Sequence, residues 1–126
     1  MSTDPYSPEV RALFADPAHA GAIDDACCVE LDDQGLRIAL YATVEDGTIT
    51  ALRFLAWGCP HLIAAAEAFC RDYEGRDPGQ LLEFSSSGLM QSLSVPVEKT
   101  GRILVLEDAV RSLGNVVREA LKAQED

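Results

Sequence analysis

Residues 36–60 decide the fold and read LRIALYATVEDGTITALRFLAWGCP. Apolar and polar residues alternate in the first part of this stretch, which predicts a half-buried strand. The Asp46-Gly47 pair is a strong hairpin signal. The residues after it are rich in β-branched and aromatic side chains, which favours a return strand. The two-residue period ends at 58–60, so the stretch predicts an antiparallel hairpin that leads directly into a helix.

The residues before the hairpin predict one helix and one further strand. Ser7-Pro8 marks a helix start, with a serine cap and proline at the first helical position. Asp16-Pro17 ends that helix, because proline disfavours helical backbone in the residue before it. Residues 27–31 read as a short first strand that joins the hairpin.

The residues after the hairpin predict helices. The first has an apolar stripe and a C-terminal glycine, namely Leu62, Ala66, Phe69, Tyr73 and Gly75. Residues 79–93 read as one or two short helices. A long helix from about Lys99 to the end has a predicted buried stripe of Leu106, Ala109, Val110, Leu113, Val116, Val117, Ala120 and Leu121. This order predicts an α+β fold in a single domain over 1–126, a three-stranded antiparallel sheet with an N-terminal helix and several C-terminal helices packed on it.

Length and charge limit the classes of partner. The chain has 126 residues, of which 48% are hydrophobic and 25% charged, a globular balance. Its net charge of −11 argues against nucleic acid and anionic membrane as partners, because both need basic patches. Neither a signal peptide nor an apolar run of membrane-spanning length is visible in the sequence. We therefore expect a cytoplasmic protein whose cysteines are reduced.

Cys59 is the most informative candidate residue. It lies where the predicted strand ends and the helix starts, and backbone N–H groups and the helix dipole there favour a thiolate. His61 follows two residues later. A thiolate with a nearby imidazole can ligate a soft metal or act as a nucleophile. The spacing leaves open the alternative of a buried small cysteine beside a surface histidine.

Cys27 and Cys28 are further candidate metal ligands. Neighbours on a strand point to opposite faces, so at most one could face a given site, whereas in a loop both could turn toward Cys59. Two or three thiolates with His61 would make a zinc or iron site. The alternative is one core cysteine and one incidental cysteine. Cys70 lies on the apolar side of its helix and is predicted to be core packing.

The remaining polar candidates are expected to be solvated. His19 follows Pro-Ala in a predicted loop, and Asp24-Asp25 and Asp32-Asp33 lie in turn-like regions. The sequence contains no Gly-rich phosphate loop, nucleophile elbow or zinc-protease motif. We therefore do not expect an enzyme.

Several stretches, taken together and in order, match one family. They are Tyr6 to Val10 with Asp16-Pro17 and Gly21, Asp46 to Cys59 with its aromatic-Gly-Cys end, the alanine-rich helix that follows, Val95 to Lys99, and Leu106 to Ala109. This set resembles the IscU/NifU N-terminal family of iron–sulfur cluster assembly scaffolds. The resemblance covers nearly the whole chain and implies the same α+β fold.

The resemblance implies a protein that accepts sulfur and iron, assembles a [2Fe–2S] cluster and passes it on. The family's ligands are three cysteines, an aspartate near the first and a histidine beside the third. Only the middle cysteine carries over, as Cys59, while the His-Cys pair falls on Gly101-Arg102.

The first Cys-Gly-Asp of the family has two possible positions. It falls on residues 33–35 without a gap, or on 27–29 with a gap of about six residues. Either way the resemblance implies an incomplete site, with Cys59 as cofactor ligand and Cys28, Cys27 and His61 as substitute metal ligands.

Two functions follow as expectations. The first is a scaffold-like protein of iron–sulfur cluster assembly that binds iron, zinc or a [2Fe–2S] cluster through Cys59. The alternative is a cluster-free relative that binds proteins, an adaptor or regulator of assembly without a cofactor. In either case the expected partners are a cysteine desulfurase or other assembly proteins. A structural or regulatory zinc site and a thiol enzyme that uses Cys59 and His61 rank lower.

Overall fold

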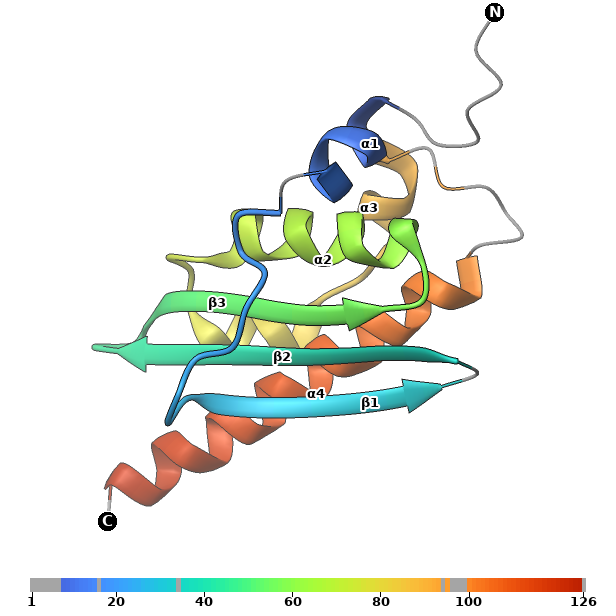
Figure 1. Ribbon diagram of the computed structural model, residues 1–126. Coiled ribbons are helices and arrows are strands. Elements are labelled where there is room, and N and C mark those ends of the chain that lie inside the picture. Colours follow the sequence, from blue (N-terminus) through green and yellow to red (C-terminus); the bar gives the residue numbers. More distant parts are fainter. Residues whose placement is uncertain (1–7, 16, 34, 94, 96–99, 126) are drawn as a thin grey trace, which may run out of the picture.

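The fold is built on a three-stranded antiparallel sheet (Figure 1), seen in a computed structural model that describes residues 8–15, 17–33, 35–93, 95 and 100–125. The strands β1 (Cys27–Asp33), β2 (Leu36–Glu45) and β3 (Thr48–Trp57) lie in the order β1-β2-β3. Asp46 and Gly47 both have positive φ, 53° and 74°, as a tight hairpin turn requires. The predicted sheet is therefore confirmed. β1 ends at Asp33, two residues beyond the predicted strand over 27–31.

The helices pack on one face of the sheet. They are α1 (Pro8–Ala15), α2 (Pro60–Tyr73), the 3-10 helix η1 (Pro78–Glu83), α3 (Ser87–Ser92) and α4 (Thr100–Glu125). α4 packs against β1 and β2, α2 packs against β3, and α1 lies on α2 (Figure 1). The α+β architecture is confirmed. The predicted cap at Ser7 and the predicted helix start at Lys99 lie outside the described residues.

The core forms between the sheet and helices α2 and α4. Alternate residues of β2 face the helices and are buried, namely Leu36, Ile38, Leu40 and Ala42. The predicted α4 stripe is buried from Leu106 to Leu113 and at Val117. Val116 is 37% exposed, so its prediction was wrong. Ile103 and Val105 extend the buried stripe toward the start of α4.

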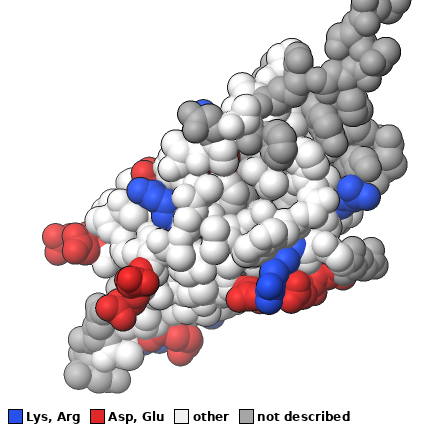
Figure 2. Space-filling model, in the orientation of Figure 1, with Lys and Arg blue, Asp and Glu red and all other residues white. Residues whose placement is uncertain are grey.

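The opposite face of the sheet carries the alternate residues of the three strands. Ala39, Tyr41 and Leu55 lie on it, and Trp57 is 48% exposed. Arg37 lies over the Trp57 ring at 5.7 Å. In Figure 2, charged side chains gather mainly toward the margins of the face shown. Among the described residues, no helix is long and apolar enough to cross a membrane.

Gly58 joins β3 to α2 in a conformation that favours glycine. Its φ is +110°, and an added Cβ would lie 2.9 Å from the Gly35 carbonyl oxygen and 2.9 Å from Leu36 Cδ2. The hairpin glycine Gly47 also has positive φ, but an added Cβ there would meet nothing within 4 Å. Substitutions at the two glycines therefore separate the cost of a strained φ from the cost of a steric clash.

Gly58→Ala is expected to lower the free energy of unfolding by about 2 kcal/mol, because it combines a strained φ with a backbone clash. Gly47→Ala is the matched control with strain alone and is expected to cost less. Urea unfolding followed by circular dichroism measures both. Equal losses would contradict a role for the contact between residues 58 and 35.

Candidate functional site

Cys59 lies at the junction of β3 and α2, as the sequence predicts. It is the N-cap of α2, with extended backbone (φ −151°, ψ 126°), and Pro60 follows at the first helical position. Its carbonyl oxygen accepts the Ile63 N–H at 3.1 Å, so the helix starts directly after it. The side chain is 2% exposed. The thiol is therefore buried at a helix N-terminus.

Arg102, in the first turn of α4, acts on the Cys59 thiol. Burial of the thiol raises its pKa. A hydrogen bond from the Arg102 side chain, backbone N–H groups of Leu62 and His61, and the charge of Arg102 lower it, and the net pKa is below the ordinary value. The arrangement therefore favours a thiolate paired with a guanidinium.

A hollow of about 520 Å³ opens beside this pair. It is lined by the end of β1, the start of β2, Gly58 and the start of α4, with Asp33, Gly35, Gly101 and Arg102 among its residues. When the family resemblance is aligned without a gap, residues 33–35 take the place of the family's first ligand group, and Gly101 and Arg102 take the place of its third. Three segments that are far apart in the sequence thus meet at Gly58, the residue before Cys59.

Cys27 and Cys28 lie at the other end of β1. Cys27 pairs with Ala42, whereas Asp33 pairs with Leu36 at the end near Cys59. At the rise of an antiparallel strand, Cys27 lies roughly 20 Å along the strand from Asp33. Cys28 is exposed and Cys27 half-buried, on opposite faces of the sheet. The structure does not bring either thiol together with Cys59.

His61 is the one sequence-predicted candidate that lies beside Cys59. Its Nδ1 is 4.0 Å from Cys59 Sγ, and the side chain is 2% exposed. The alternative of a surface histidine is therefore wrong. In the described part of the chain, no group of three His, Cys, Asp or Glu residues could hold a metal ion.

Cys70 is fully buried, which confirms its prediction as core packing, and burial raises its pKa. Asp24, Asp25, Asp32 and Asp33 are exposed, as predicted.

A buried charge network around Glu67 was missed by the sequence analysis. The Glu67 side chain is 0% exposed, and its carboxylate accepts the His19 backbone N–H at 2.7 Å and Arg71 Nε at 2.8 Å. His19 Nδ1 lies 2.6 Å from Glu67 Oε2. The prediction that His19 is solvated is wrong, since its side chain is 15% exposed.

The network fixes the segment before β1 to the free edge of β3. The Gly21 N–H donates to the Phe54 carbonyl at 2.8 Å, and the Phe54 N–H donates to the His19 carbonyl at 3.0 Å. One signal could have revealed it, because Glu67 shares its helical stripe with Ile63 and Cys70. An acid on such an apolar stripe must be paired.

Arg102→Gln is expected to move the pH dependence of Cys59 alkylation to higher pH. The arginine lowers the pKa of the thiol, so its removal raises that pKa and reduces the thiolate fraction at neutral pH. Peptide mass spectrometry after a short exposure to iodoacetamide measures each cysteine separately. The exposed Cys28 in the same sample is the control, and its profile should not move. An unchanged Cys59 profile would contradict the pairing.

Comparisons with known proteins agree with this fold and with the resemblance. The family model for the NifU-like N terminal domain matches residues 5–115. The iron–sulfur cluster assembly protein IscU of Plasmodium falciparum is 27% identical over 112 residues, which is 84% of this chain and 69% of that protein.

Solved structures show the same fold at low sequence identity. The N-terminal part of a nitrogen-fixing NifU-like protein from Brucella abortus aligns with a TM-score of 0.72 at 12% identity, over 90% of this chain and 94% of that one. A putative iron–sulfur cluster assembly scaffold protein for the SUF system, from Fervidobacterium islandicum, aligns with a TM-score of 0.58 at 16% identity, over 88% and 85%. The chain therefore belongs to the NifU-like N-terminal domain family of iron–sulfur cluster assembly scaffolds.

Proposed function

We propose that this chain takes part in iron–sulfur cluster assembly as a cluster-free relative that binds a cysteine desulfurase or another assembly protein. One observation carries the proposal: Arg102 lines the hollow next to Cys59 and lowers the pKa of its thiol, at the place where the resemblance puts the family's third cysteine. A fixed cation opposes a cationic metal there. The chain acts as an adaptor or regulator and catalyses no reaction of its own.

The geometry supports contact with a partner at Cys59. The hollow beside it is lined by three glycines, which leave room for a narrow segment of another protein. The exposed Trp57 ring lies two residues from the thiol and offers an aromatic anchor of the kind enriched in interfaces. A thiolate at this position can also accept sulfur from a persulfide on the partner, forming a new S–S bond as the partner's thiolate leaves. This chemistry needs a reducing compartment, in keeping with the predicted cytoplasmic location.

A second candidate is metal or cluster binding through Cys59 and His61. The 4.0 Å between Sγ and Nδ1 is compatible with one zinc or iron ion between them. Cys27 and Cys28 are too far along β1 to complete that site, so the remaining ligands would come from a partner. An ion or cluster would then be cargo held between two proteins.

The experiment mixes the purified chain with a cysteine desulfurase from the same source and measures binding by calorimetry, with anaerobic iron and sulfide reconstitution in parallel. We expect a complex that forms equally well with Cys59→Ser, and no charge-transfer absorption from the chain alone. Sulfur uptake from cysteine and the desulfurase should require Cys59. A stable cluster on the wild-type chain alone, lost in Cys59→Ser, would replace this proposal by the second candidate.

A further inference from the structure

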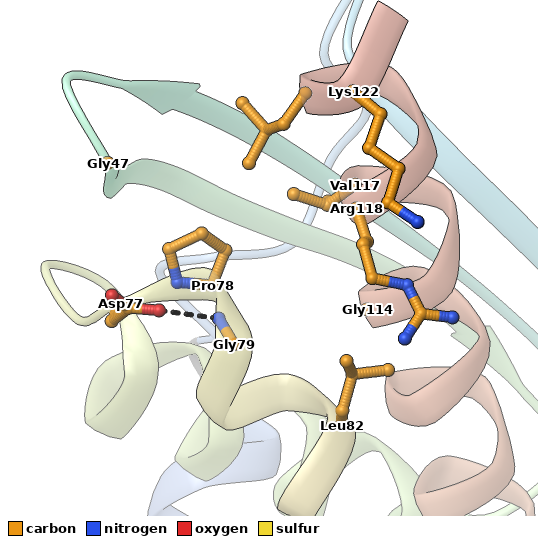
Figure 3. A pocket seen from close by; sticks show the side chains of 10 residues that line it. Gly47, Asp77, Pro78, Gly79, Leu82, Gly114, Val117, Arg118 and Lys122 are labelled. Atoms are coloured by element: carbon orange, nitrogen blue, oxygen red, sulfur yellow. Dashed lines mark hydrogen bonds between the residues drawn. The ribbon is translucent and has the colours of Figure 1, made fainter.

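A second hollow lies at the opposite end of the molecule from Cys59. Its volume is about 380 Å³, and it is enclosed by the β2–β3 turn at Gly47, by η1 and by the second half of α4 (Figure 3). Such a volume lies in the range of small-molecule sites. This end of the sheet carries the hairpin turn, whereas Cys59 follows the other end of β3. The two sites are therefore independent.

Glycine shapes this hollow. At Gly114 of α4 an added Cβ would lie 2.9 Å from Leu82 Cδ2 and 3.1 Å from Leu81 Cβ, so η1 rests directly on the helix there. One turn further along α4 the two elements separate. Gly47 and Gly79 contribute no side chains to fill the gap.

The walls are apolar, and two cations lie on one side. Pro78, Leu82, Val117 and Leu121 supply the apolar surface. Figure 3 shows the Arg118 and Lys122 side chains on the α4 side of the hollow, across from Pro78. The acid of the lining, Asp77, is already used, because its Oδ1 accepts the Gly79 N–H at 2.7 Å.

Arg118 and Lys122 differ in their contacts from the arginines elsewhere in the described part of the chain. Most of those pair with carboxylates, namely Arg37, Arg53, Arg71, Arg76 and Arg111. Arg118 instead donates to Asn115 Oδ1 at 2.8 Å, and within the described part of the chain neither Arg118 nor Lys122 has a carboxylate partner. Two like charges four residues apart on a helix repel each other. An anion between them would relieve that repulsion.

We infer that this hollow binds a small organic anion with an apolar body. The body lies against the walls formed by η1 and α4, and the anionic group lies between Arg118 and Lys122, away from Asp77. Apolar walls with a few placed polar groups are typical of small-molecule sites. The two cations are complementary to the ligand in a chain whose net charge of −11 otherwise repels anions.

The test compares two fluorescent dyes of similar ring structure, anilinonaphthalene sulfonate and uncharged phenylnaphthylamine, on the folded full chain. We expect saturable binding of the sulfonate and its displacement by octanoate. The double variant Arg118→Gln, Lys122→Gln should weaken the sulfonate about tenfold and leave the uncharged dye within about twofold. Both side chains are exposed, so the variant should fold.

The matched control is Arg37→Gln, Arg53→Gln, which removes the same charge from strands that do not line this hollow and should leave both dyes unchanged. An equal effect of the two double variants would overturn the inference, because the binding would then depend only on the net charge of the protein. Equal weakening of both dyes by the first variant would also overturn it. Displacement by an acidic, leucine-containing peptide but not by octanoate would overturn the small-molecule assignment.

Discussion

Glu67→Ala is expected to lower the free energy of unfolding by about 3–5 kcal/mol, the cost of breaking a buried charge pair. The carboxylate has no exposed surface and holds both the backbone and the ring of His19. Without it, the His19 N–H loses its acceptor and the segment up to Gly21 loses its anchor to α2. Urea unfolding followed by circular dichroism measures the loss. The amide protons of Gly21 and Phe54 should also exchange faster than those of the central strand β2.

The matched control lies on the same helix. Asp72 pairs with Arg76 at 2.8 Å, but both side chains are about half exposed. Asp72→Ala removes one carboxylate from a surface pair and is expected to cost less than about 1 kcal/mol. Equal losses in the two variants would mean that the Glu67 network contributes no more than a surface pair.

The contrast between the hairpin and this network shows what local sequence can predict. The turn at Asp46-Gly47 and the helix start at Pro60 are specified by the residues themselves, so the sheet and α2 were predicted correctly. Glu67 and His19 are 48 residues apart and meet only because α2 packs beside the β3 edge. No spacing rule encodes that contact, although the acid on an apolar stripe is a warning of it.

The candidate site shows the same limit. A thiol at the strand–helix junction was predicted from local signals. Arg102 lies in the first turn of α4, where the helix dipole disfavours a cation. Cys59 supplies a reason for this cation, because Arg102 lies close enough across the fold to lower the pKa of the Cys59 thiol. Whether Asp33 or Cys27 stands in the place of the family's first cysteine depends on strand register. The register places Asp33 at the Cys59 end of the sheet.

The double substitution Asp33→Cys, Arg102→Cys is therefore expected to turn the chain into a cluster-binding protein. Both positions line the hollow beside Cys59, so three thiolates would converge from β1, α2 and α4. The substitution also removes the cation that opposes metal. With an added thiol as the fourth ligand, anaerobic reconstitution should give about one [2Fe–2S] cluster per chain, because four thiolates hold such clusters. The measurement is charge-transfer absorption with iron and sulfide analysis, and wild type is the baseline.

Two controls locate the new cluster. Adding Cys59→Ser to the double variant should abolish the absorption, since it removes the central ligand of the set. Adding Cys27→Ser and Cys28→Ser should leave it unchanged, because those thiols lie at the far end of β1. A cluster that needs Cys27 or Cys28 would contradict the placement of the site at the hollow. A double variant that folds but binds no more iron than wild type would show that Arg102 is not what keeps a cluster from this site.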